Sequence, residues 1–580
     1  MRFYLPPLLA HILHLNPQQN CEVVMGIRLN HSFFWIKTIG VVVIFLMLSA
    51  FIKPKEKEIG QATLDSIGMG SSIHLRVGTD GLPGAYQQLE DMNVHWVREE
   101  IPWREVEQTP GQFQWYYSNG NTYRDFHFML EEAEKHDLEV VAVLSTGPAY
   151  LPHVYPDQTV DVDLLVEYWK NYVQAVVDRF GDQIDYWEIS PQANNADTWG
   201  KVMFPTNLDA TSDPNPFLFA RMLTTAEKVI KKHNSKDTVI LGGLYSSPAN
   251  TCETTPLIFL NEIKNAGAWK HFDVIAINPY WENNPPEAWM PRGPEVDPEL
   301  MSCDSSSTGS SNLVDEIRTI RDFANQNGKK PIWITEIGWR EDWLSYPAAQ
   351  HFITTDQVEA NYIVRSIIPL ISEDNVEKIF WYSLYEDPEN PGFVLGSEGQ
   401  QALRNIGRLL GGARSLGQFQ QLSSYATPQD LGIYEFRFRK EGRLIIYAWT
   451  ASGGESPFLI TFNDLPGKNY RAYAANTQDL SVEGGMELSV SSDQSLTIYV
   501  NEFPVILIQQ NPNLVTSLTH RMDDGLKKLV NHQKGRVDSW FDAQISNLGE
   551  KALDWAEGKI YNLLNQSFDR IEENMSLRNN

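Results

Sequence analysis

The sequence predicts a (β/α)8 barrel followed by a small antiparallel β-sandwich. Between residue 68 and about residue 415, short apolar runs typical of buried strands alternate with amphipathic runs typical of helices. Such an alternation, repeated eight times, is the sequence signature of a (β/α)8 barrel. From about residue 430 to residue 510 the apolar residues recur with a period of two, between glycine turns, which indicates antiparallel strands.

Each barrel strand is a short apolar run. In chain order the predicted strands are GSSIHL (70–75), HWVRE (95–99), EVVAVL (139–144), YWEI (186–189), VILGG (239–243), VIAIN (274–278), IWIT (332–335) and KIFWY (378–382). Helical patterns lie between them, for example over 161–180 and over 312–328, the latter ending at a glycine. A doubly wound open sheet is the alternative, disfavoured because no glycine-rich phosphate loop follows the first strand.

After the barrel, two further regions are expected. The predicted sandwich strands are IYEFRFRK (433–440), RLIIYAWT (443–450), PFLITF (457–462), YRAYAAN (470–476) and SLTIYV (495–500). Beyond them, apolar residues at three- and four-residue steps over 537–567 predict a long amphipathic helix. Its polar face is mixed in charge rather than basic, which favours a protein partner or self-association over a membrane surface. Packing against its own chain is the alternative.

These patterns divide the chain into four parts: an N-terminal tail with an apolar segment (1–57), the barrel (58–420), the sandwich (421–510) and a helical tail (511–580). The apolar segment, FFWIKTIGVVVIFLMLSAFI (33–52), has about the ~20 residues that a membrane span needs. We therefore expect a membrane anchor with the barrel outside the cytoplasm. A cleaved signal peptide, and hence secretion, is the alternative because the uninterrupted run is shorter.

Charge and cysteine content narrow the partners and the compartment. The net charge of −27 argues against a nucleic-acid partner. Two of the three cysteines, Cys252 and Cys303, fall in long loops predicted after the fifth and sixth strands. Both loops would lie at the C-terminal face, where barrel enzymes build their sites. Export would allow a disulfide between these two cysteines.

Six segments in order resemble one clan of enzymes. They are WVREEIPWREVEQTPGQFQW, DYWEISPQANNADTW, DVIAINPYW, PIWITEIGW, IFWYSLYED and QQALRNIGRLLGGARSLGQF. The chain resembles the retaining glycoside hydrolases whose acid/base follows strand four and whose nucleophile ends strand seven. It is most similar to xylosidase- and iduronidase-like (family 39-like) or cellulase-like members. The resemblance covers about residues 68–510; no single motif is strong, and their order makes it specific.

The resemblance assigns roles at the barrel mouth. Glu336 takes the position of the nucleophile, a carboxylate that attacks the anomeric carbon of a sugar. Arg98 and Tyr280 take the positions of the groups that hold this carboxylate. Trp381 takes the position of the floor under the sugar, Trp339 lies in the nucleophile motif, and Asn278 replaces a frequent His. The resemblance implies a carbohydrate substrate and neither cofactor nor metal.

One position departs from the clan. Where an Asn–Glu pair is expected, the sequence reads Pro191-Gln192, and a Gln amide can neither protonate a leaving group nor activate water. Asp197 is a candidate for a relocated acid, and Glu99 and Glu100 lie at the mouth of strand two. Glu188, four residues before Gln192 on the same strand, lies too deep.

Two main functions stay open from the sequence. The first is a retaining glycosidase that uses Glu336 with a weakened or relocated acid, similar to the plant thioglucosidases that carry Gln at the acid position. The second is a catalytically inactive protein that binds glycans. A purely structural scaffold is a third alternative.

Overall fold

The computed structural model describes residues 67–510, except 71, 121, 146, 148–160, 197, 200–213, 248–253, 298–301, 352, 388–390, 422–431, 452–456, 479 and 481–483. Contacts divide the chain into Met1–Lys57 and Glu58–Asn580, and the fold below belongs to the second unit. The predicted apolar segment, the helical tail, Asp197 and Cys252 lie outside the described residues. Among those that are described, no helix has the length and apolar character of a membrane span.

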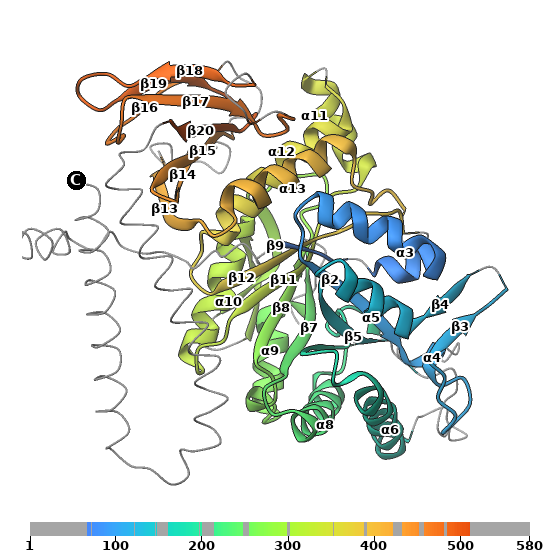
Figure 1. Ribbon diagram of the computed structural model, residues 1–580. Helices are drawn as coiled ribbons and strands as arrows, with labels where there is room; N and C mark the ends of the chain where they lie inside the picture. Colours follow the sequence, from blue (N-terminus) through green and yellow to red (C-terminus); the bar gives the residue numbers. More distant parts are fainter. Residues whose placement is uncertain are drawn as a thin grey trace, which may run out of the picture. The chain divides into compact units, whose positions relative to one another are not determined.

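Eight parallel strands form a closed barrel, which confirms the predicted fold class (Figure 1). The barrel closes because the first strand pairs with the last one and with the second one. In the order of the chain the strands are β1 (Ile67–Met69), β2 (Trp96–Pro102), β5 (Glu139–Ser145), β6 (Tyr186–Ile189), β7 (Thr238–Ser246), β8 (Val274–Pro279), β11 (Ile332–Ile337) and β12 (Val376–Trp381).

The predicted first strand, 70–75, is wrong. The strand is β1, and the helix α3 (Ile73–Asp91) begins where the prediction extends the strand. The helix start is stabilised from a distance: Glu99 of β2 accepts hydrogen bonds from the backbone N–H of His74 (3.1 Å) and from Ser72 Oγ (2.6 Å). A carboxylate at a helix N-terminus satisfies otherwise unpaired donors. This contact joins residues that are far apart in the sequence, so local patterns do not reveal it.

Helices surround the barrel (Figure 1). The two predicted helices are confirmed, and each begins at a side-chain cap: Asp161 accepts from the N–H of Leu164, and Asn312 from that of Asp315. The helices are α3, α4 (Trp103–Val106), α5 (Phe126–Lys135), α6 (Val162–Phe180), α8 (Pro216–His233), α9 (Pro256–Asn265), the 3₁₀-helix η3 (Trp269–His271), α10 (Leu313–Gln326), α11 (Glu341–His351), α12 (Thr355–Ile371) and α13 (Ser397–Leu410). Two hairpins lie in the loops: β3 (Tyr116–Ser118) with β4 (Tyr123–Asp125), and β9 (Met290–Asp297) with β10 (Ser302–Ser311).

The interior of the barrel is layered. One layer is an apolar plug of packed side chains: Trp96, Val141, Ile240, Val274, Ala276, Trp333 and Phe380, with Tyr186 against it. Side chains alternate between the two faces of a strand, so residues two positions further along also point inward. On β2, β6 and β8 those positions are Arg98, Glu188 and Asn278, all buried. A polar layer therefore lies above the plug, towards the C-terminal ends of the strands.

The second domain consists of antiparallel sheets that fit the predicted β-sandwich. Strand β13 pairs with β14, so the sheet begins at Arg414, before the predicted boundary at residue 420. The order in the larger sheet is β13-β14-β15-β20-β17-β18, and β16 pairs with β19. The strands are β13 (Arg414–Gln421), β14 (Ile433–Lys440), β15 (Arg443–Thr450), β16 (Phe458–Phe462), β17 (Asn469–Ala474), β18 (Met486–Ser489), β19 (Leu496–Val500) and β20 (Val505–Gln509).

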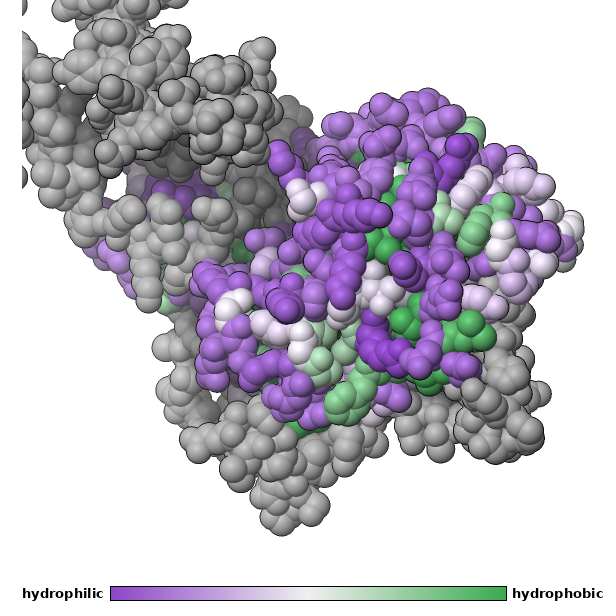
Figure 2. Space-filling model, turned by 90° about the horizontal axis from the view of Figure 1, so that it is seen from below, coloured by the Kyte–Doolittle hydropathy of each residue, from purple (hydrophilic) through white to green (hydrophobic). Residues whose placement is uncertain are grey.

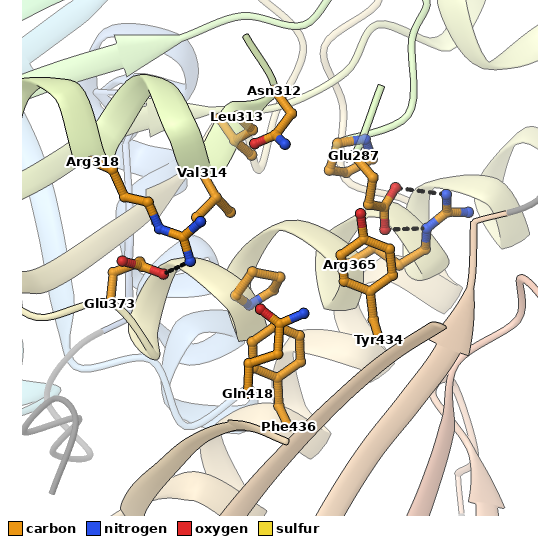
Figure 3. Close-up of a pocket in the computed structure, with 12 residues that line it drawn as sticks. Glu287, Asn312, Leu313, Val314, Arg318, Arg365, Glu373, Gln418, Tyr434 and Phe436 are labelled. Atoms are coloured by element: carbon orange, nitrogen blue, oxygen red, sulfur yellow. Dashed lines mark hydrogen bonds and ion pairs between the residues drawn. The ribbon is translucent and has the colours of Figure 1, made fainter. Parts of the chain in front are cut away.

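A buried ion pair of the barrel, Glu287 with Arg365, lies where the barrel meets the sandwich, and a hydrogen bond to Glu287 joins the two (Figure 3). Glu287 accepts hydrogen bonds from Arg365 Nε (2.9 Å) and Nη2 (2.7 Å), and from Trp449 Nε1 of β15 (2.5 Å). Tyr434 stacks on Trp449 with ring centroids 5.3 Å apart. The pocket in Figure 3 lies at this junction, and residues of α10, α12, β13 and β14 line it.

The surface is mainly hydrophilic on the face that Figure 2 shows. Hydrophobic residues form small patches between the hydrophilic ones. The apolar side chains are concentrated in the core between the strands and the helices, where Trp103, Trp169 and Trp187 are fully buried.

Candidate functional site

Glu336 lies near the C-terminal end of β11, where side chains from four strands meet. Its Oε1 accepts a hydrogen bond from Arg98 Nη1 (2.9 Å). Its Oε2 accepts from Tyr280 OH (2.6 Å) and from Gln192 Nε2 (3.2 Å). The side chain is 8% exposed. The structure therefore brings four of the predicted site residues, Glu336, Arg98, Tyr280 and Gln192, into direct contact.

Arg98 is the centre of a buried charge network. Its Nε and Nη2 donate to the two oxygens of Glu188 (2.6 and 2.8 Å), and its Nη1 also donates to the carbonyl of Gly70 (3.0 Å). Burial alone lowers the pKa of Arg98, but the charges of Glu188 and Glu336 outweigh it, so the pKa is raised overall. The guanidinium is thus a permanent cation beneath Glu336.

Two opposing effects act on the pKa of Glu336, the nucleophile candidate. Burial raises the pKa of Glu336, whereas the Arg98 charge and the Tyr280 hydroxyl lower it, and the net shift is upward. An elevated pKa makes a carboxylate a better base and a stronger nucleophile while Arg98 still favours its ionised form.

Gln192 is held in one orientation by both ends of its amide. Its Oε1 accepts from Thr198 Oγ1 (3.0 Å) and Asn195 Nδ2 (3.3 Å), so its Nε2 faces Glu336. Its backbone has a positive φ of 49°, and its N–H donates to the carbonyl of Gly243 (2.9 Å). The side chain of Gln192 thus reaches Glu336 directly, with 3.2 Å between Nε2 and Oε2.

Three other predicted residues lie in buried positions. Asn278 is fully buried below the site, and its Oδ1 accepts from Thr335 Oγ1 (2.7 Å). Trp381 is also fully buried and stacks on Trp339, with ring centroids 5.9 Å apart. Trp339 Nε1 donates to the carbonyl of Asn284 (2.9 Å). Both tryptophan side chains pack in the core between the barrel strands and the surrounding helices. The side chain of Trp381 therefore does not point to the barrel mouth, where the predicted sugar floor would have to be.

Strand alternation explains where Trp381 lies. Phe380 points into the barrel plug and Trp381 points outward, so the next inward position is Tyr382. The ring of Tyr382 packs edge-on against Tyr280, with centroids 6.4 Å apart. Tyr382 is thus a site residue that the sequence analysis missed. The FWY run contains the signal, because the inward position of Phe380 fixes that of Tyr382.

The carboxylates of strand two diverge. Glu99 points away from the barrel axis, where Tyr86 OH donates to it (2.9 Å) in addition to the contacts at the start of α3. Glu100 is partly exposed and accepts from Ser145 Oγ (2.5 Å). Asp197 lies outside the described residues. Of the carboxylates considered as substitutes for the acid, only Glu100 is described at the barrel mouth.

Glu99 should make stability depend on pH. Burial raises its pKa from 4.5 to about 7, although the donors around it act in the opposite direction. Between these two pH values the folded protein keeps a proton that the unfolded chain has lost, so stability falls as the pH rises through this window. Glu99→Gln should remove up to about 1.4 kcal/mol of slope per pH unit. Denaturant unfolding of both proteins at pH 5, 6 and 7 measures the slope, and equal slopes would contradict the prediction.

Comparison with solved structures finds proteins of similar fold. The chain is similar to a family 39 glycoside hydrolase from Bacteroides cellulosilyticus WH2, with 16% identity, a TM-score of 0.53, and 78% of this chain and 82% of that chain covered. A monomeric beta-xylosidase from Caulobacter crescentus CB15 has 13% identity and a TM-score of 0.46, with 79% and 98% of the two chains covered. A family 51 alpha-L-arabinofuranosidase from Bifidobacterium longum has 10% identity and a TM-score of 0.46, with 78% and 96% covered.

No protein-family model matches the sequence, and no curated protein matches it either. The likeness to the family 39 enzyme shows that the chain has a glycoside-hydrolase-like barrel fold. The resemblance that the six sequence segments predicted is thus confirmed for the fold.

Proposed function

We propose that the protein acts on glycans by a retaining mechanism in which Glu336 is the nucleophile and general-acid assistance is weak. The observation that carries the proposal is the position of the Glu336 carboxylate, which Arg98, Tyr280 and Gln192 hold at the mouth of the barrel. This arrangement provides an oriented carboxylate as the nucleophile. It provides no acid that could protonate the leaving group, because Gln192 has no acidic proton.

In the first step, an oxygen of Glu336 forms a bond with the anomeric carbon while the bond from that carbon to the leaving-group oxygen breaks. The electron pair stays on the leaving group. Tyr280 and Arg98 donate to Glu336 and keep the carboxylate in place. Gln192 has no acidic proton to give, so groups that are stable as anions leave fastest.

In the second step, the oxygen of a water forms a bond with the anomeric carbon, and the bond from that carbon to Glu336 breaks with its electron pair on the carboxylate. The proton of the water passes to solvent. A Glu at the acid/base position would take the proton of this water. The Oε1 of Gln192 already accepts two hydrogen bonds and is not basic. The second step should therefore be slow, and a covalent glycosyl–enzyme should accumulate.

The alternative is a protein that binds glycans without turnover. The contact between Gln192 Nε2 and Glu336 Oε2 (3.2 Å) favours it, because a donor then occupies the oxygen that would otherwise react. The two functions differ in one property only, the formation of a bond between Glu336 and the sugar.

Covalent trapping decides between them. We expect 2,4-dinitrophenyl 2-deoxy-2-fluoro-glycosides, whose leaving group needs no proton, to add one sugar mass to the protein, on the peptide that contains Glu336. Glu336→Gln should abolish the adduct, and Ser345→Ala, a change at an exposed position of α11, should not. Binding of sugars without an adduct would favour the alternative, and neither binding nor adduct would contradict both.

The location of the protein is part of the proposal. We infer export from the apolar segment 33–52, with anchoring or cleavage as the two outcomes, so that the site faces glycans outside the cytoplasm. A disulfide between Cys252 and Cys303, and recruitment of a partner through residues 511–580, are predictions of the sequence that accompany it.

A further inference from the structure

An ionic cluster forms one wall of the barrel mouth beside Tyr382. Arg76 lies on α3, after the first strand, and its Nη2 donates to Asp387 Oδ2 (2.7 Å). The same oxygen accepts from Tyr382 OH (2.6 Å). The side chains of Arg76 and Asp387 are 15% and 3% exposed. Arg76 and Asp387 thus pair with each other and hold the hydroxyl of Tyr382.

Glu100 completes this side of the mouth. It lies two residues beyond Arg98 on β2, hence on the same inward side and about 7 Å nearer the mouth. Its charge contributes to the raised pKa of Glu336 and to that of Arg76, so it lies within electrostatic range of both. The strands β12, β1 and β2 are neighbours in the barrel, which brings Asp387, Arg76 and Glu100 to adjacent positions.

The charges of this network do not balance. Arg98 is paired with Glu188 and Glu336, and Arg76 is paired with Asp387. Glu100 accepts from the neutral Ser145, and among the described residues it forms no ion pair. In the described part of the mouth, two arginines therefore face four carboxylates, and the partly exposed Glu100 is the one that no described cation pairs with.

We propose that the site selects a sugar that presents hydroxyl or ammonium groups to Glu100, and that it rejects sugars that carry a carboxylate or sulfate there. The proposal rests on the proposed function, since it names the substrate class of the same site. A carboxylate accepts hydrogen bonds from hydroxyl and ammonium groups, whereas a second anion placed beside it is repelled without compensation.

The size of the discrimination follows from charge repulsion, since the charge of Glu100 already acts on Glu336. A sugar bound against Glu336 would lie within several ångströms of Glu100, in a partly buried site where like charges are weakly screened. We expect a uronide to bind at least about tenfold more weakly than the matched neutral sugar. Because the effect is electrostatic, the ratio should shrink at high salt.

The test uses matched aryl glycosides that differ only at C6: glucoside with glucuronide, and galactoside with galacturonide, with the 6-amino-6-deoxyglucoside as the cationic probe. Ligand-observed NMR gives the affinities and covalent trapping gives the rates. Glu100→Gln removes the charge and should bring each neutral-to-uronide ratio close to one. Ser145→Ala removes the hydrogen bond but keeps the charge, and it should leave the ratio nearly unchanged.

Two failures can be told apart. Uronides that bind as well as their neutral partners, or ratios that Glu100→Gln does not change, would overturn the selection by Glu100 even if Glu336 is labelled. If none of the sugars binds or labels the protein, the proposed function fails, and the selection fails with it.

Discussion

Replacing Gln192 with Glu and Pro191 with Asn should raise kcat/KM on glycosides with poor leaving groups by about 10²–10⁴. The double change restores a general acid at the position where the clan carries it, and an amide that can bind the sugar 2-hydroxyl. Substrates with activated aryl leaving groups should gain much less in the first step, because they need no proton. Hydrolysis of an alkyl glycoside and of its dinitrophenyl analogue by both proteins measures the difference.

The structure predicts how the rescued activity should depend on pH. A Glu in the present conformation of Gln192 would bring one of its oxygens about 3.2 Å from Glu336, so the two carboxyl groups would titrate as a coupled pair. We therefore expect the rescued activity to depend on pH with two apparent pKa values, which belong to the pair.

Two controls accompany the rescue. Pro191→Asn alone should stay inactive on alkyl glycosides, and adding Glu336→Gln to the double variant should abolish the gain. If the double variant is folded, binds sugar and still shows no gain, loss of the acid is not what limits this site, and the glycan-binding alternative is strengthened.

Replacing Arg98 with Met should lower the free energy of unfolding by about 3–5 kcal/mol. The change leaves Glu188 and Glu336 buried side by side without the cation that compensates both, and Met fills only part of the space. Denaturant unfolding followed by tryptophan fluorescence measures the loss. Adding Glu188→Leu should recover part of it, because one of the two uncompensated charges is then removed.

A surface ion pair provides the matched control. Arg340 and Asp342 are paired at 2.9 Å with side chains 36% and 61% exposed. Arg340→Met should cost less than about 1 kcal/mol. Similar losses for the two arginines would show that the network around Arg98 is not the source of the stability.

Much of the fold follows from local patterns. The predicted range of β6 agrees with the structure, and most other barrel strands differ only at their ends. In the sandwich, the period-two pattern gives the range of β14 as the structure has it. The first strand fails because a tertiary contact decides it: the apolar Ile73 fits a strand or a helix, and Glu99 stabilises the helix. The strand β13 is missed because the sequence prediction places its first residues in the segment of the last barrel helix, whereas they pair with β14.

Part of the candidate site was also predictable from the sequence. Motif order identified Glu336, Arg98, Tyr280 and Gln192, which come from four strands and meet only in the folded barrel. The aromatic partner was misplaced by one residue, because Trp381 and Tyr382 are adjacent and only the inward position of Phe380 distinguishes them. No sequence motif predicts the ion pair of Arg76 with Asp387, because the two residues lie at opposite ends of the barrel sequence.

Strand β2 carries three consecutive charged residues, and each has a different task. Arg98 faces the axis beneath the nucleophile candidate, Glu99 faces outward and stabilises the start of α3, and Glu100 faces the mouth. A shift of one residue in the pairing of β2 would send each of these side chains to the opposite face. The register of β2 therefore fixes all three contacts at once. Insertion of one residue within β2 would disturb the start of α3, the charge network and the mouth together.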